Sequence, residues 1–370
     1  MSGAPSVERE LALSHLGYVA FAFAVPLVAA AAIEAGIALL SDVWGRARLV
    51  VLGEGVLAAS LFFTASARTP EGLALGLALA GAASGVSCGA AQALLVASSA
   101  GGADRAMVRW SLYSAVGDVV APVITGAAIS LGHSYRGALE AVAAAASLQC
   151  AVSAWLLVGG QPVRQPATDS EGPGEPLGVA LARAIRLPRL WAWLFAAASC
   201  TLLDELVIAL AALRLERAEN TGAAVATAAA VAFSVGAVVG SAVTDRIVER
   251  ISAPRVLATS AALCALSLAA FLTTASASAS CAALLVVGVT CAPHHPLAMA
   301  RAYGELPENP GTVQAVGQIF VAVDVVAPLA LGVVADRFGL DVAIGCLLVQ
   351  PAVILIACLL LRPCRRGARP

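Results

Sequence analysis

Five acidic side chains lie inside apolar stretches of the sequence, where an ionised carboxylate is unfavourable. Asp118, Asp324, Asp204, Glu205 and Glu34 are each surrounded by hydrophobic and small residues. In a hydrocarbon layer a charged side chain costs at least about 2.5–3.5 kcal/mol, so such an acid is protonated, paired or facing water. Desolvation also moves a carboxyl group toward titration near neutral pH. We therefore take all five as candidates for coupling proton movement to another process.

Two of these acids belong to an internal repeat. Residues 116–126 read VGDVVAPVITG and residues 323–332 read VDVVAPLALG, so Asp118 corresponds to Asp324. A proline bends a helix and frees a carbonyl, and small residues at four-residue spacing let helices approach closely. The alternative role for the two acids is to bond this freed carbonyl while protonated. We predict helix-bend and packing roles for Gly117, Pro122, Gly126, Pro328 and Gly332, in a transporter built from two related bundles.

A few other polar residues interrupt the apolar runs and are candidates for a cavity that contacts a small-molecule substrate: Gln92, His294, His295 and Arg301. The two histidines are adjacent and point to different faces of a helix, and the cysteines are scattered singly. Neither pattern has metal-ligand spacing. We expect no metal and no cofactor.

Residues 85–89 read GVSCG, which matches the Gly-x-Ser-x-Gly pattern of hydrolases. That pattern needs a sharp turn from a strand into a helix, whereas this copy lies in an Ala- and Gly-rich apolar stretch. An intramembrane serine hydrolase is therefore the less favoured alternative, and we expect that the protein is not an enzyme.

The composition requires a membrane protein. Hydrophobic residues make up 60% and charged residues 12% of the 370 residues, with a mean hydropathy of +0.90, which is too little charge for a soluble surface. The net charge of −1 predicts no nucleic-acid partner. Eleven apolar runs approach the length that crosses a bilayer, at residues 13–40, 49–67, 73–100, 108–131, 137–158, 190–213, 225–244, 256–274, 282–300, 313–335 and 342–361.

We predict an all-α integral membrane protein of two pseudo-symmetric bundles with five and six spans. The Gly-, Pro- and acid-rich stretch that begins at Gly159 indicates a solvated linker. The predicted domains are residues 1–158, the cytoplasmic linker 159–189 and residues 190–370. Most arginines fall on the side of the linker, which places the linker and the C-terminus in the cytoplasm.

The segment DVWGRAR at residues 42–48 resembles the cytoplasmic signature loop of the major facilitator superfamily, and Asp245-Arg246 occupies the same place in the second half. In that family the loop holds one access state of an alternating-access transporter by pairing charges across the bundles. The resemblance implies a conformational latch formed by Asp42, Gly45, Arg46, Arg48, Asp245 and Arg246. Val248 replaces the second glycine, so the second copy is the weaker one.

Residues 117–126 also resemble the proline-bearing motif of proton-coupled exporters, with Ala121 and Thr125 in place of glycines. An arginine that the family uses for coupling is missing from residues 73–100. The family's first helix is missing too, and we expect a late start site rather than a reduced form. The resemblance implies a bacterial inner-membrane antiporter, monomeric in the bilayer, that exports a small solute in exchange for protons. The alternatives are a cation-coupled importer or uniporter, and a transport-dead receptor.

Overall fold

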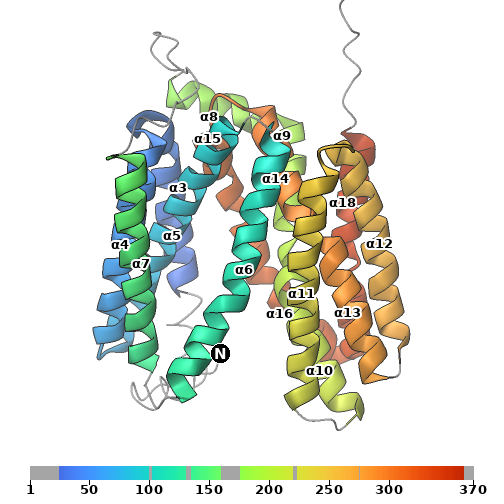
Figure 1. Cartoon of the computed structure of the whole chain (residues 1–370). Helices are drawn as coiled ribbons and strands as arrows, with labels where there is room; N and C mark the ends of the chain where they lie inside the picture. Colours follow the sequence, from blue (N-terminus) through green and yellow to red (C-terminus); the bar gives the residue numbers. More distant parts are fainter. Residues whose placement is uncertain are drawn as a thin grey trace, which may run out of the picture. The chain divides into compact units, whose positions relative to one another are not determined.

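The computed structural model describes residues 25–99, 102–130, 135–159, 176–219, 223–274 and 276–361, which are helical apart from short turns and contain no strand (Figure 1). Within these ranges, nine helices are long and apolar enough to cross a membrane, and Val25–Leu39 forms a shorter apolar helix. The all-α membrane fold is therefore confirmed. The predicted number of eleven spans is not.

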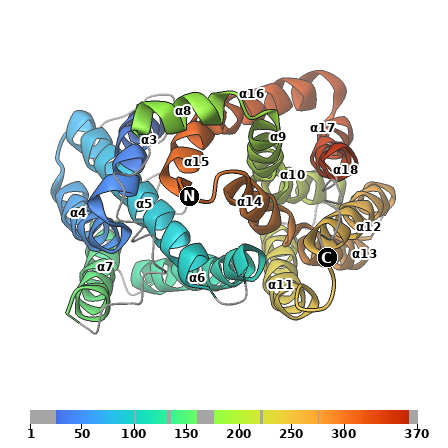
Figure 2. The same ribbon diagram turned by 90° about the horizontal axis from the view of Figure 1, so that it is seen from above.

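One compact unit is formed by Met1–Ser98, Val119–Arg186 and Pro307–Val321. α4 packs against both α5 and α7, and α15 packs against α3, α5 and α8 (Figure 2). A short helix from late in the chain therefore completes this first unit. Its helices are α3 (Val25–Trp44), α4 (Arg46–Ser66), α5 (Pro70–Ser98), the second part of α6 (Gly102–Ser130), α7 (Tyr135–Leu157), α8 (Leu177–Ile185), α15 (Pro310–Gly317) and the 3-10 turn η3 (Gln318–Phe320).

The second unit is formed by Ser99–Asp118, Leu187–Leu306 and Ala322–Pro370. α13 packs against both α11 and α12, while α14 packs against α9 and α18 packs against α12. Its elements are the first part of α6, α9 (Pro188–Ala198), the π-helical turn η2 (Leu202–Leu206), α10 (Val207–Glu219), α11 (Ala223–Ile247), α12 (Ala253–Thr273), α13 (Ala277–Cys291), α14 (His294–Glu305), α16 (Val321–Phe338), α17 (Leu340–Cys346) and α18 (Val349–Leu360).

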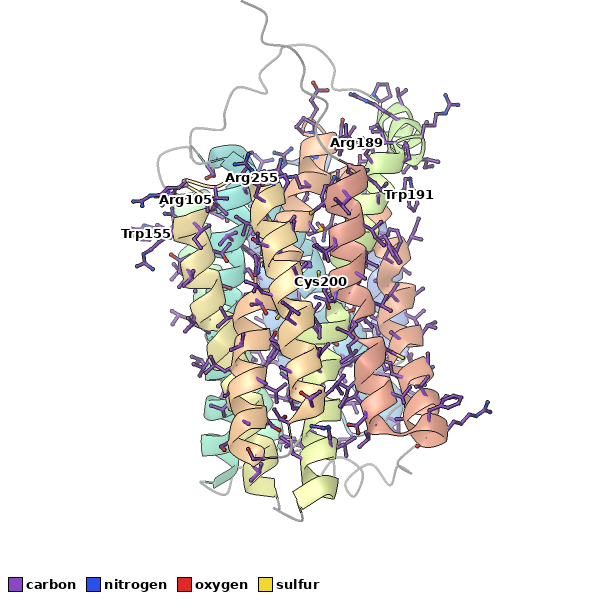
Figure 3. All side chains as sticks on the ribbon, turned by 90° about the vertical axis from the view of Figure 1, so that its right-hand side faces the viewer. Arg105, Trp155, Arg189, Trp191, Cys200 and Arg255 are labelled. Carbon is purple, nitrogen blue, oxygen red and sulfur yellow. The ribbon has the colours of Figure 1, made fainter. Side chains whose placement is uncertain are left out.

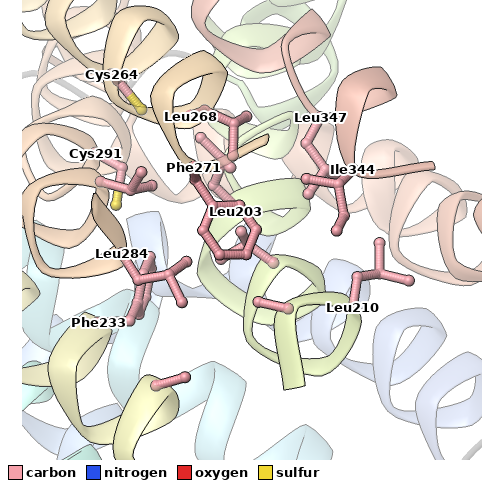
Figure 4. Packing of buried hydrophobic residues seen from close by; sticks show 14 of the residues in the cluster. Leu203, Leu210, Phe233, Cys264, Leu268, Phe271, Leu284, Cys291, Ile344 and Leu347 are labelled. Atoms are coloured by element: carbon pink, nitrogen blue, oxygen red, sulfur yellow. The ribbon is translucent and has the colours of Figure 1, made fainter. Parts of the chain in front are cut away.

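Side chains from several helices fill the core of the second unit (Figure 4). Leu203, Leu268 and Phe271 are fully buried there, and Leu284 of α13 joins the same cluster. Leu203 belongs to η2, so the π-helical turn is anchored in the core by an apolar side chain. The residues that follow Leu203 are positioned by this anchor.

α11 and α13 approach each other through glycines. A Cβ atom added at Gly236 or Gly240 of α11 would meet the backbone of α13, and one added at Gly288 of α13 would meet the backbone of α11. Close packing of small residues is a general means of associating helices in a membrane. Gly117 and Gly332, which were predicted to pack helices, are not in such close contact. An added Cβ at either position would meet no heavy atom within 4 Å. The packing role predicted for Gly117 and Gly332 stays a prediction.

The predicted linker contains ordered structure. Residues 177–185 form α8, whose Ala180 and Ala184 are buried, and α8 packs against α15. Residues 159–189 are thus not wholly a solvated connection. Each unit also includes a segment from the other half of the sequence. The predicted domain boundaries follow the sequence repeat and stay a prediction.

Candidate functional site

Asp204 and Glu205 lie in η2, the π-helical turn inside the apolar stretch Pro188–Leu215. Leu203 is fully buried, whereas both acids are exposed on the surface of the helices. Figure 3 shows that the nearby Cys200 lies partway along its bundle, while Arg105, Arg189 and Arg255 lie near one end. An exposed carboxylate at such a depth needs water or a polar partner, because contact with lipid chains is costly. π-helical turns are also frequent at functional sites.

A third acid accompanies this turn. Asp324 of α16 interacts electrostatically with Glu205 and lies beside the hydroxyl group of Thr201. One of its oxygens, Oδ1, is buried and has no hydrogen-bond partner. Asp204 accepts a weak hydrogen bond from the thiol of Cys291 at 3.8 Å. Four of the five predicted proton-coupling acids thus lie in the second unit, with Asp118 at the end of its first segment. Glu205 and Asp324 are close enough to influence each other's charge.

The polar residues behind η2 are buried and connected. The backbone N–H of Leu203 donates to Oε1 of Gln350 at 2.9 Å, and Nε2 of Gln350 lies 3.2 Å from Nδ1 of His294. Both Gln350 and His294 are fully buried. The structure therefore places His294 inside the helix packing. Its neighbour His295 is partly buried on the same helix, α14.

Glu34 belongs to the first unit. Its carboxylate on α3 hydrogen-bonds the side chain of Gln314 on α15. A Cβ added at Gly85 would collide with the Glu34 carboxylate, and one added at Gly89 would lie 3.2 Å from Gln314. The Glu34 and Gln314 side chains thus pack against Gly85 and Gly89, the two glycines of the hydrolase-like pattern. The pattern lies within the continuous helix α5, without the strand-to-helix turn that a hydrolase needs.

The first unit buries another acid, Glu54 of α4, which is only 6% exposed. Nε2 of Gln149 donates to its Oε1 at 2.8 Å, and its other oxygen has no hydrogen-bond partner. In the sequence, the only signal for Glu54 is that an acid lies inside the apolar run 49–67. Gln92, the other amide predicted for a cavity, is half-buried in α5.

The predicted latch is described in part. Gly45 is the single non-helical residue between α3 and α4, and its φ of 87° is the left-handed conformation that glycine adopts most easily. This explains the glycine of the signature loop. Arg46 and Arg48 begin α4. The side chains of Asp42, Asp118, Pro122 and Gly126 lie outside the described residues.

Asp245 of the second copy is held by arginines of α6. Its Oδ1 accepts from Nε of Arg105 at 3.2 Å and from Nε of Arg109 at 3.1 Å, and Arg105 also pairs with Glu249. Arg246 instead bonds within its own helix, to the carbonyl of Ala242 at 3.4 Å. The pairing arginines were not predicted, although their spacing of four residues at the start of a helix would put them on one face.

Arg301, predicted as a cavity residue, is an ion-pair residue in the structure. Its Nη2 lies 2.6 Å from Oδ2 of Asp104, and each side chain is 33% exposed. Asp104 precedes the predicted fourth span. Burial raises the pKa of the Asp104 carboxyl above its usual value, and the Arg301 charge opposes that rise.

An apolar pocket of about 350 Å³ is present in the first unit, between α3, α4 and α5, and its lining includes Ile33, Leu52 and Leu79. None of the predicted site residues lines it. Among the described residues, no three His, Cys, Asp or Glu side chains are grouped so that they could hold a metal ion.

Comparisons with known proteins agree with this architecture. A single-residue variant of the E. coli fucose:proton symporter FucP has a TM-score of 0.73 and 14% sequence identity, with 96% of this chain and 92% of that chain covered. A structure of the proton:xylose symporter XylE, bound to 6-bromo-6-deoxy-D-glucose, has a TM-score of 0.70 and 12% identity, with 97% and 90% covered.

A FucP structure in the outward conformation has a TM-score of 0.71 and 17% identity over 96% of this chain and 92% of that chain. No match is found among curated protein sequences. Residues 2–323 match the sequence model of the Major Facilitator Superfamily. The chain belongs to the Major Facilitator Superfamily.

Proposed function

We propose that this protein is a secondary active transporter that moves a small solute by alternating access and is driven by protons. The observation that carries the proposal is the exposed acid pair Asp204 and Glu205 on a π-helical turn inside an apolar helix, with Asp324 near enough to interact electrostatically with Glu205. A protein without a transport role has no reason to retain the cost of such acids. We assign proton binding to Glu205 and Asp324, with Asp204, Asp118 and Glu34 as the remaining candidates.

For the direction of transport we propose export, on the basis of the exporter-like motif at residues 117–126. Import with protons is the second candidate, since FucP and XylE are both proton symporters. We also propose a bacterial cytoplasmic membrane location with the C-terminus inside, as the arginine distribution indicates. A reporter fused after Pro370 that is active only outside the cytoplasm would contradict this orientation.

The signature-loop residues Asp42, Gly45, Arg46 and Arg48 and the second-copy residue Asp245 are proposed to stabilise one access state. For Asp245, the support is its pairing with Arg105 and Arg109. The Asp245 and Arg105 side chains are only 20% and 30% exposed, whereas Arg109 is 46% exposed. A single ion pair near the surface contributes little, and a network of several charges contributes more. We therefore propose that the latch shifts the equilibrium between access states and adds little to the free energy of folding.

The experiment reconstitutes the purified chain in liposomes that contain a pH-sensitive dye. A panel of sugars, amino acids and lipophilic cations is first screened for thermal stabilisation, because a ligand that binds the folded state raises the melting temperature. A stabilising compound should then move protons across the liposome membrane when it is added, and the sign of the pH change distinguishes exchange for protons, as in an exporter, from co-transport with protons, as in a symporter. Solute flux without proton movement would contradict proton coupling.

A further inference from the structure

A buried polar chain connects η2 to two other helices of the second unit. In a regular α-helix the N–H of Leu203 would bond the carbonyl of Ser199. Here it is shared between Oε1 of Gln350 at 2.9 Å and the carbonyl of Cys200 at 3.2 Å. The shorter contact is with the side chain from α18. Gln350 thus satisfies a backbone group that the irregular turn takes out of the normal helical pattern.

The geometry also fixes the state of His294. Because Oε1 of Gln350 accepts from Leu203, Nε2 of Gln350 is the donor that faces His294. Nδ1 of His294 must then accept, so the ring is neutral and carries its proton on Nε2. Nε2 makes no hydrogen bond of good geometry, although the backbone of Ser260 lies near the ring. A proton on Nδ1 would place two donors face to face and break the chain.

The buried polar chain affects the orientation of the acids, because Asp204 and Glu205 directly follow Leu203 in the sequence. Leu203 faces the core, and Asp204 and Glu205 follow it directly on the exposed side. A π-helical turn contains more residues than an α-helical turn, so successive side chains are rotated by a smaller angle. The two acids therefore come closer to a common face than they would on a regular helix.

We propose that Gln350, held by neutral His294, is a positioning residue that keeps Leu202–Leu206 in its π-helical form and so directs Asp204 and Glu205 toward one face. This inference rests on the proposed function for the role of the acids, but the positioning itself does not need transport. It replaces the substrate-contacting role predicted for His294. A fully buried amide in an apolar bundle is costly unless both of its polar ends are bonded, and here both are.

The test compares variants that keep or remove each hydrogen bond. Gln350→Glu, when protonated, offers an acceptor to Leu203 and a donor to His294, whereas Gln350→Met has similar length and offers neither. His294→Asn places an oxygen near the position of Nδ1 and cannot carry a proton, whereas His294→Leu removes the acceptor. Each substitution changes one end of the chain and leaves Asp204, Glu205 and Asp324 in place.

The readout is carbodiimide labelling of the carboxyl groups in the purified protein in nanodiscs, with mass spectrometry giving the labelling ratio of Glu205 to Asp324. Melting temperatures are measured alongside. We expect Gln350→Met and His294→Leu to change the ratio about fivefold, the population shift that one ordinary hydrogen bond produces. Gln350→Glu and His294→Asn should keep the wild-type ratio. A merely structural role would lower the melting temperature without changing the ratio.

The inference is overturned if Gln350→Met folds and labels like the wild type, or if His294→Asn changes the ratio as much as His294→Leu does. If Gln350→Met and His294→Leu do not fold, the labelling ratios of Gln350→Glu and His294→Asn decide whether the inference holds. Wild-type labelling in both supports the hydrogen-bonded chain, and altered labelling in either contradicts it. Because labelling requires no substrate, a failure of the transport proposal would be seen separately in the liposome experiment.

Discussion

At the scale of single residues, the contrast between Asp324 and Asp104 shows how surroundings decide what an acid does. Asp324 keeps one buried oxygen without a partner, while Asp104 is paired with Arg301 at 2.6 Å. Pro328 lies one helical turn after Asp324 in α16, so the carbonyl that this proline frees is that of Asp324 itself. The sequence could predict the acid and the proline, and it could not predict which acids are paired.

The Asp104–Arg301 pair leads to a prediction about pH. Burial raises the pKa of Asp104 and Arg301 opposes this, so Arg301→Met should raise it further. An acid whose pKa is higher in the folded state holds its proton there more tightly, and folding then weakens as the pH rises through that value. The melting temperature of Arg301→Met, compared with wild type, should fall more between acidic and neutral pH.

Arg183→Met is the matched control, because Arg183 pairs with Glu308 at 3.9 Å with both side chains largely exposed. Exposed pairs of this kind contribute little to stability, so its pH profile should stay close to wild type. The two variants are measured by thermal unfolding across the same pH series. Parallel profiles for Arg301→Met and wild type would contradict the assigned pairing.

At the scale of helices, hydrophobic runs predicted most spans to within a few residues, because a membrane helix must be apolar along its whole length. α12 spans Ala253–Thr273, against the predicted 256–274. The π-helical turn η2 could not be predicted, since the apolar run continues through it and its hydrogen-bond partner Gln350 comes from far along the chain. The same holds for the contact of α15 with α3 and α5.

Gly85 offers a test of that contact. Replacing glycine by alanine inside a helix ordinarily stabilises it by about 1 kcal/mol. At Gly36 of α3 an added Cβ meets nothing within 4 Å, whereas at Gly85 it collides with the Glu34 carboxylate. We expect Gly36→Ala to raise the melting temperature. Gly85→Ala should raise it less, because the added methyl group displaces the Glu34 carboxylate and disturbs its hydrogen bond to Gln314. An equal rise for both variants would show that the Glu34–Gln314 pair does not pack on Gly85.

At the scale of the whole molecule, each compact unit takes a segment from the other half of the duplicated sequence. One boundary between the units falls directly after Asp118 in α6, and another falls after Val321, close to Asp324. The repeat identified these acids as equivalent, but it did not indicate that segments are exchanged near them. Sequence similarity between halves reports common ancestry, and contacts form between whichever surfaces are complementary.

The central claim is that protons drive transport through the acids of the second unit, and one measurement tests it most directly. Glu205→Gln keeps the size and hydrogen bonding of the side chain but cannot carry a proton. In liposomes with an imposed pH gradient, with a solute identified by thermal stabilisation, this variant should exchange solute across the membrane like the wild type. It should lose accumulation driven by the gradient. Accumulation at the wild-type level in Glu205→Gln would contradict the claim and place the proton on another residue.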